Sequence, residues 1–116
     1  MKIRSFNEEV VFDDKNIKTK VLLESSFTKE IRIVLKKGQF MKEHKTPFPI
    51  VVHVLKGEID FGISETVYHL KEGELLTLEG SIPHDLKAKE DSIVRLTLSK
   101  SDKVERVENV IKTSSK

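Results

Sequence analysis

The stretch GQFMKEHKTPFPIVVHVLKGEIDF, residues 38–61, indicates the fold of this chain more clearly than any other part of it. Apolar side chains alternate over 50–56 and again over 58–63, on either side of a Lys-Gly pair that forms a turn. Two prolines before the first run fix their own backbone and favour extended neighbours. The stretch therefore predicts two β-strands joined by a turn, preceded by an extended segment that follows His44.

The same pattern of short alternating segments continues on both sides of this stretch. Further strands are expected over 20–24, 30–36, 66–70, 75–78, 83–89 and 92–98. Turn residues separate the strands every eight to twelve residues, which is typical of an all-β sandwich or barrel. We therefore predict an all-β fold whose barrel core occupies about residues 20–99.

The last part of the chain changes from a two-residue period to a helical one. Asp102, with Glu105 three residues later, is typical of a helix cap, and Val104 and Val107 follow helical spacing. This pattern predicts a short amphipathic C-terminal helix over about residues 102–112. Its apolar face has to be covered, either by a flank of the barrel or by a partner subunit.

Composition limits the class of protein. We expect a single domain over residues 1–116, long enough to be stable without a disulfide or a metal. The absence of cysteine excludes a disulfide framework, a thiolate zinc site and a cysteine nucleophile. The 21 Lys and Arg are interspersed with 19 Asp and Glu, unlike the basic stripe of a nucleic-acid-binding protein. With no signal-peptide pattern and no membrane-length apolar run, we expect a cytoplasmic protein that binds neither nucleic acid nor membranes.

Alternation along the strands places the four histidines differently. His84 shares a face with Leu86, so it should point into the barrel, where its ring needs a hydrogen bond, a water or a metal. It is either a core histidine with a protein partner or a ligand-binding residue. His53 and His69 fall on the outward faces of their strands. His44 lies in a predicted loop before the two prolines, which either hold it steady or simply lead into the next strand.

Together these segments resemble the cupin family. The first cupin motif reads Gly, five residues, His-x-His, three or four residues, Glu, six residues, Gly. Here Gly38 is followed after five residues by His44, and Gly57 stands at the last position. Thr46 replaces the second histidine and Ile50 replaces the glutamate, so two of the four usual metal ligands are absent.

The second cupin motif is matched more fully. It begins with a glycine and carries a histidine about eleven residues on, after a proline-rich turn. Gly73 and His84 occupy these two positions, and Gly80 and Pro83 lie in the turn. The resemblance covers about residues 30–98.

The resemblance implies a double-stranded β-helix, or jelly-roll, barrel with its functional site inside. It also implies that His44 and His84 lie close together and hold one divalent metal ion, such as Zn, Fe, Mn or Ni. Small cupins of this kind are often homodimers, so we expect a homodimer here. The resemblance does not assign a reaction, because the same fold serves many activities.

Three functions remain open at this point. In the first, the barrel binds a small molecule, with His44 and His84 donating hydrogen bonds and with Thr46 and Ile50 in the ligand-binding site. The apolar lining would include Ile50, Val52, Val54, Phe61, Leu76, Leu86 and Leu96. In the second, the two histidines hold the metal of a dioxygenase or isomerase. In the third, the barrel is inert and the C-terminal helix docks on a partner.

No third metal ligand is evident from the sequence. Glu43 should point away from the adjacent His44, and Glu79 is expected to be a solvated turn residue, although it could reach the barrel mouth. Tyr68 and Thr77 could add polar groups to the site. Arg95 falls on an outward strand face and is expected outside the barrel.

Overall fold

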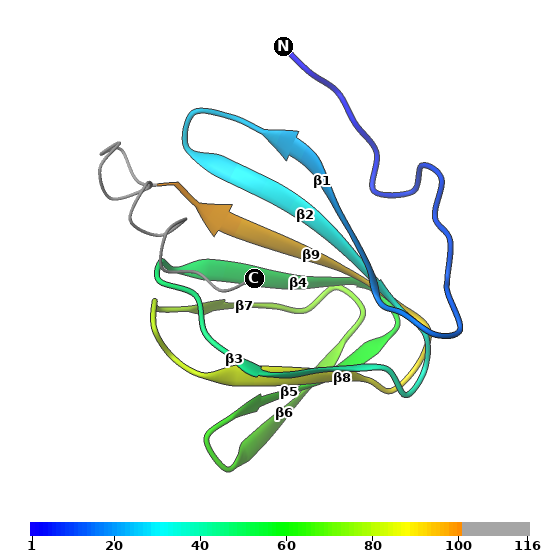
Figure 1. Ribbon diagram of the computed structural model, residues 1–116, viewed down its shortest axis with the longest axis vertical. Coiled ribbons are helices and arrows are strands. Elements are labelled where there is room, and N and C mark those ends of the chain that lie inside the picture. Colours follow the sequence, from blue (N-terminus) through cyan, green and yellow to red (C-terminus); the bar gives the residue numbers. More distant parts are fainter. Residues whose placement is uncertain (101–116) are drawn as a thin grey trace.

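The computed structural model describes residues 1–100, which form two antiparallel β-sheets packed face to face (Figure 1). The strands are β1 (Lys18–Glu24), β2 (Thr28–Leu35), β3 (Phe40–His44), β4 (Ile50–Lys56), β5 (Glu58–Ile63), β6 (Thr66–Lys71), β7 (Leu75–Leu78), β8 (His84–Ala88) and β9 (Ser92–Ser99). One sheet has the order β1-β2-β9-β4-β7 and the other the order β3-β8-β5-β6. The all-β prediction is confirmed. The predicted helix at 102–112 lies outside the described residues.

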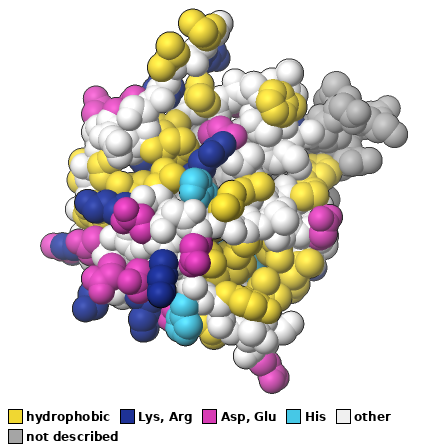
Figure 2. Space-filling model, turned by 180° about the vertical axis from the view of Figure 1, so that it is seen from behind, with side chains coloured by type: hydrophobic (Ala, Val, Ile, Leu, Met, Phe, Trp, Pro, Cys, Tyr) yellow, Lys and Arg dark blue, Asp and Glu magenta, His cyan; other side chains and the backbone are white. Residues whose placement is uncertain are grey.

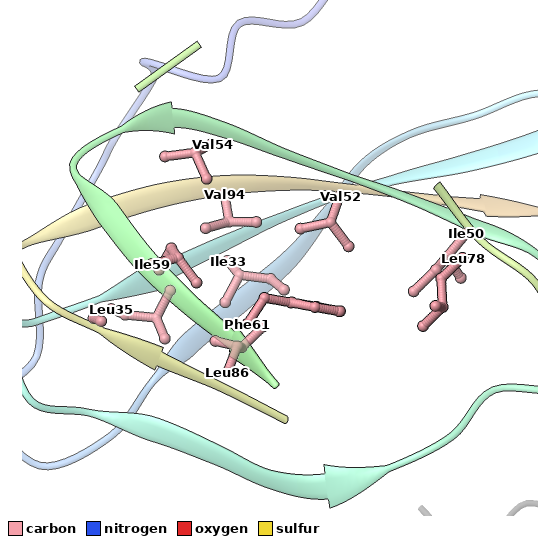
Figure 3. Packing of buried hydrophobic residues seen from close by; sticks show 11 residues of the cluster. Ile33, Leu35, Ile50, Val52, Val54, Ile59, Phe61, Leu78, Leu86 and Val94 are labelled. Carbon is pink, nitrogen blue, oxygen red and sulfur yellow. The ribbon is translucent and has the colours of Figure 1, made fainter. Parts of the chain in front are cut away.

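Strict alternation of burial in β4 and β8 shows which face of these two strands forms the core. In β4 the even-numbered residues from Ile50 to Val54 are buried, and in β8 the same holds from His84 to Ala88. Figure 3 shows the resulting apolar cluster between the two sheets. Its buried members are Ile33, Leu35, Ile50, Val52, Val54, Ile59, Phe61, Leu78, Leu86, Ala88 and Val94. Each large side chain buried there contributes roughly 1.5–3 kcal/mol through removal of apolar surface from water.

Tight turns connect the strands where the sequence predicts them. Gly57, between β4 and β5, has a φ of 90° and lies directly against Asp91 and Ser92. A side chain at Gly57 would be strained by the backbone angle and would also collide with these neighbours. The Ser92 hydroxyl closes this corner, because it accepts from the Glu58 N–H and can donate its one proton to the carbonyl of Glu90 at 2.7 Å or that of Glu58 at 3.2 Å.

One strand was not predicted. Phe40–His44, assigned to a loop from the sequence, is β3, and it pairs with β8. Its burial pattern shows no strict alternation, so the two-residue period is not visible in its sequence. Pairing with a neighbouring strand, rather than intrinsic propensity, therefore determines its conformation.

The residues that precede β1 form no strand, and most of them lie on the outside of the five-stranded sheet (Figure 1), although Ile17 packs against the apolar cluster. The Arg4 guanidinium donates to the Leu22 carbonyl at 3.0 Å. From β2, the Arg32 guanidinium donates to the carbonyls of Phe6 and Glu8 at 3.1 and 2.5 Å. This N-terminal segment therefore covers the outer face of β1 and β2.

Charged side chains of both signs are mixed over the surface, as the composition predicts. Figure 2 shows this mixture on one face, where acidic and basic groups alternate with apolar ones. Arg95 lies on the outer face as expected, and its Nε donates to Glu30 Oε1 at 2.9 Å. Within residues 1–100 there is no helix long and apolar enough to span a bilayer.

Candidate functional site

His44 and His84 face each other on the inner side of the four-stranded sheet. They are paired residues of the β3–β8 ladder, and their ring centroids lie 4.4 Å apart at an interplanar angle of 63°. His84 is only 3% exposed, and its ring stacks on Phe61 with a centroid distance of 5.3 Å. The inward position predicted for His84 is confirmed, and the structure brings the two predicted site histidines together.

A β-bulge directs His44 toward its partner. Met41 pairs with Leu86, but His44 rather than Glu43 pairs with His84, so β3 has one extra residue here. Simple alternation from the inward Met41 would place Glu43 inside and His44 outside. The bulge reverses the two, as bulges beside functional sites often do. Glu43 instead borders a groove on the outer face with Asp60, which confirms that it points away from His44.

Two backbone contacts hold the loops that follow β3 and precede β8. The Ser81 N–H donates to the Thr46 carbonyl at 2.6 Å. Gly80 lies so close to the Pro47 carbonyl that any Cβ at this position would collide with it. Gly80, in the turn of the second motif, therefore allows the close approach of the two loops that carry the site.

The backbone also determines which nitrogen of each histidine is available to a ligand. His44 Nδ1 lies 2.6 Å from the Lys42 carbonyl, and His84 Nδ1 lies 2.9 Å from the Ile82 carbonyl. A carbonyl can only accept, so both Nδ1 atoms carry the proton and each neutral ring keeps a lone pair on Nε2. Neither Nε2 has a hydrogen-bond partner within residues 1–100. The two histidines, expected from the sequence to donate hydrogen bonds, therefore offer acceptors at Nε2 in their neutral form.

The environment of His84 favours this neutral form. Burial lowers the pKa of His84 below its ordinary value, and the nearby His44 lowers it further, whereas the Ile82 carbonyl opposes the shift. Near pH 7 the ring is therefore uncharged and has an acceptor at Nε2, while its face stacks on Phe61.

The other two positions of the first motif do not supply ligands. Thr46 donates its hydroxyl proton to the Phe48 carbonyl at 3.0 Å. Ile50 is 3% exposed and packs in the apolar cluster, with Leu78 beside it in Figure 3. Glu79 is exposed, as expected for a solvated turn residue.

The two histidines supply only part of what a metal centre needs. Two imidazoles whose Nδ1–H groups are anchored to carbonyls have the arrangement of metal-bound histidines. However, residues 1–100 contain no group of three or more His, Asp or Glu placed to hold an ion. The residues therefore fit a weak two-imidazole site and do not fit the three-ligand centre of a zinc or non-haem iron enzyme.

The remaining polar residues considered from the sequence lie away from this pair. His53 is on the outward face of β4, as predicted, although its Nδ1 is buried without a partner in the described part of the chain. His69 is exposed on β6 and contacts Asp60. Thr77 donates to the Ile50 carbonyl at 3.2 Å, and Tyr68 is 49% exposed.

Fold and site together define a small jelly-roll barrel with an inward histidine pair at one end of an apolar interior. A family model described as a cupin domain matches residues 31–99, more than half of the chain. The chain therefore belongs to the cupin family. No curated protein matches it.

Solved structures agree with this assignment. An RmlC-like cupin from Desulfovibrio desulfuricans is 28% identical, with a TM-score of 0.78, covering 85% of this chain and 96% of that one. A cupin 2 conserved barrel domain protein from Leptotrichia buccalis is 29% identical, with a TM-score of 0.73, covering 80% of this chain and 45% of that one. The conserved SPY1581 protein of unknown function from Streptococcus pyogenes is 24% identical, with a TM-score of 0.75, covering 88% and 90%.

Proposed function

We propose that this cupin binds a small organic molecule at the His44–His84 end of its barrel. The two Nε2 atoms accept hydrogen bonds from hydroxyl, amine or amide groups of the ligand, and the apolar interior contacts its carbon skeleton. The observation that carries the proposal is the anchoring of both Nδ1 atoms to backbone carbonyls. It leaves two acceptors side by side on rings 4.4 Å apart.

The chemistry of the pair selects the kind of ligand. Binding pockets are commonly apolar with a few placed polar groups that give orientation and specificity. Here His84 supplies a neutral acceptor, because burial lowers its pKa, and the Nδ1–H contact of His44 directs its Nε2 lone pair to the same place. A ligand that presents two hydrogen-bond donors is therefore favoured over a carboxylate, which would meet two lone pairs.

A divalent metal ion is a weaker second ligand of the same two atoms. Imidazole nitrogen suits Zn, Ni and Fe, but affinity depends on the number of ligands, and Thr46 and Ile50 supply none. A metal-dependent dioxygenase or isomerase is accordingly not favoured. The C-terminal helix and the expected homodimer stay predictions.

The test is a thermal-shift screen with matched variants. Polyols, sugars, amines and amides are added to the wild type, to His44→Ala/His84→Ala, and to the control His53→Ala/His69→Ala, which removes the two outward histidines. A ligand should raise the Tm of the wild type and of the control but not that of the first variant. If no donor-rich compound shifts the wild type, or if the shift survives in His44→Ala/His84→Ala, the proposal is wrong.

Calorimetric titration of a metal ion provides a second measurement. Zn²⁺ titrated calorimetrically into chelator-treated protein should bind weakly, and the heat should vanish in His44→Ala/His84→Ala. Tight stoichiometric binding would contradict a two-ligand site and would restore the enzyme hypothesis.

A further inference from the structure

Arg32 is a buried cation without a negative partner. It is 4% exposed, and no carboxylate within residues 1–100 forms an ion pair with it. Its Nη1 donates to the carbonyls of Phe6 and Glu8, and its Nε is buried with no partner. Arginine keeps its charge in proteins, and a buried arginine is normally paired with an anion. Carbonyl groups orient this guanidinium but do not neutralise it.

The acidic residues nearest in sequence to its partners are engaged elsewhere. The Glu8 carboxylate pairs with Arg4 at 2.6 Å, although the Glu8 carbonyl is bound to Arg32. Asp13 Oδ1 accepts backbone N–H groups of Lys15 and Asn16 at 2.7 and 3.2 Å, and its Oδ2 lies 3.7 Å from Lys18 Nζ. The local chain therefore does not supply the missing negative charge.

Arg32 forms part of the wall of a cavity between the N-terminal segment and the β1–β2 pair. The cavity has a volume of about 200 Å³, and its other lining residues are Glu9, Val11, Lys18, Thr19, Lys20 and Val34. Lys20 is paired with Arg32 in the ladder, so both side chains lie on the same outer face. Three cationic side chains thus meet two carboxylates: Glu9 Oε1 lies 3.7 Å from Lys20 Nζ, and Asp13 Oδ2 lies 3.7 Å from Lys18 Nζ. Neither carboxylate pairs with Arg32, so one positive charge at the cavity has no acidic partner within residues 1–100.

The size of the cavity limits what it can hold. Sites for drug-sized ligands are about 300–1,000 Å³, so about 200 Å³ suits a small ion better than a nucleotide or a long chain. Arg32 forms the buried wall, and the exposed Lys18 and Lys20 form the rim. A guanidinium matches the paired oxygens of a phosphate or carboxylate group, and lysines add charge without strict geometry.

We propose that this cavity, with Arg32 at its base and Lys18 and Lys20 at its rim, is a binding site for a small oxyanion, either a phosphate or a carboxylate. The bound anion supplies the counter-charge of Arg32. Because the same guanidinium holds Phe6 and Glu8, the anion also stabilises the N-terminal segment on the sheet. The site is separate from the histidine pair, since it lies on the outer face of the other sheet.

The experiment compares inorganic phosphate, acetate and chloride at equal ionic strength. Thermal unfolding is followed for the wild type, for Lys18→Gln/Lys20→Gln and for Lys71→Gln/Lys87→Gln, a control with the same loss of charge on exposed positions of the four-stranded sheet. The rim variant leaves Arg32 and its two carbonyl contacts in place, so folding is retained. Phosphate stabilises proteins generally by exclusion from their surface, and this contribution is common to all three proteins.

In the wild type and the control, phosphate or acetate should raise the Tm above the chloride value, by roughly 10 °C at a hundred-fold excess over Kd. This extra rise should be lost in Lys18→Gln/Lys20→Gln. Amide hydrogen exchange of residues 6–12 should slow with the anion in the wild type and the control but not in Lys18→Gln/Lys20→Gln. Stabilisation by phosphate but not acetate identifies a phosphate site, and equal stabilisation identifies a general oxyanion site. Equal shifts in the wild type and rim variant, or no shift beyond chloride, would overturn the proposal.

Discussion

His84 and Arg32 are both almost fully buried, at 3% and 4% exposure, yet the protein treats them in opposite ways. His84, inside the barrel, stays neutral because burial lowers its pKa, and its Nδ1–H is satisfied by a carbonyl. Arg32, on the outer face of the other sheet, cannot lose its proton and keeps a charge without an acidic partner in the described chain.

The difference shows what each region can bind. The interior keeps an acceptor of hydrogen bonds in an apolar setting, which suits a neutral donor-rich ligand. The outer cavity keeps a cation, which suits an anion. Substitutions at these two regions should therefore lower the free energy of unfolding by amounts that can be predicted. The largest loss is expected where a charged residue is placed in the apolar interior.

Ile50→Glu places a carboxyl group inside the barrel and should have the largest effect. A buried carboxyl group shifts its pKa upward by up to three to five units, so at pH 7 it is protonated in the folded protein and ionised in the unfolded chain. This difference costs roughly 3.5 kcal/mol at pH 7, and the lost burial of the isoleucine side chain adds roughly 1.5–3 kcal/mol. Urea unfolding should show most of the stability lost, and Zn²⁺ should restore part of it, because two histidines and a glutamate form a three-ligand site. Val51→Glu, on the outer face of the same strand, is the control and should cost far less. Equal losses in the two variants would contradict the assignment of faces.

Phe61→Ala removes the ring on which His84 stacks and should cost about 3–5 kcal/mol, the usual range for a buried phenylalanine. Water admitted to the cavity should also raise the pKa of His84 toward its ordinary value, which an NMR titration of the ring protons would measure. Phe40→Ala, at a position 59% exposed, is the control and should change stability by less than about 0.5 kcal/mol. An unchanged His84 pKa in Phe61→Ala would show that packing on this ring does not cause the shift.

The sequence predicted most of the barrel because apolar alternation determines both the strands and their buried faces. Eight of the nine strands and the inward face of His84 follow from this period alone. The turn at Gly57 was equally visible, because its positive φ requires glycine. The resemblance to cupins added the prediction that His44 lies close to His84.

The rest of the site depends on features that alternation does not contain. The bulge between Met41 and His44 reverses the faces of Glu43 and His44, and only the pairing with β8 reveals it. The Nδ1 contacts come from the backbone carbonyls of Lys42 and Ile82, which no side-chain pattern indicates.

Arg32 was missed for a related reason. Its strand face reads as polar and solvated, and only the tertiary position of the N-terminal segment buries it. A charged residue between Ile31 and Ile33 gives no separate signal in the sequence. Contacts between segments far apart in the chain therefore determine the outer cavity.

Arg32→Gln should cost about 1–3 kcal/mol, because the carbonyls of Phe6 and Glu8 would lose their donor while remaining partly buried. The N-terminal segment should detach first, so limited proteolysis ahead of β1 should become faster. Arg95→Gln is the control: its guanidinium pairs with Glu30 on a half-exposed face, where such pairs contribute about 0–1 kcal/mol. Unchanged proteolysis in Arg32→Gln would show that the segment is held by other contacts.

The smallest effect should be a pH dependence that comes from His84. Its pKa in the folded state lies below the ordinary value of about 6.5, so the unfolded chain binds the proton more readily. The stability is therefore complete above about pH 6.5 and falls as the pH drops toward the folded pKa, below which the loss is constant. Urea midpoints measured from pH 8 to pH 5 should decline in the wild type and should decline less in His84→Gln. The loss of stability is limited to about 1.4 kcal/mol per unit of difference between the folded and unfolded pKa values. A parallel decline in both proteins would mean that other groups dominate the pH dependence and that the interior does not exclude charge as strongly as His84 indicates.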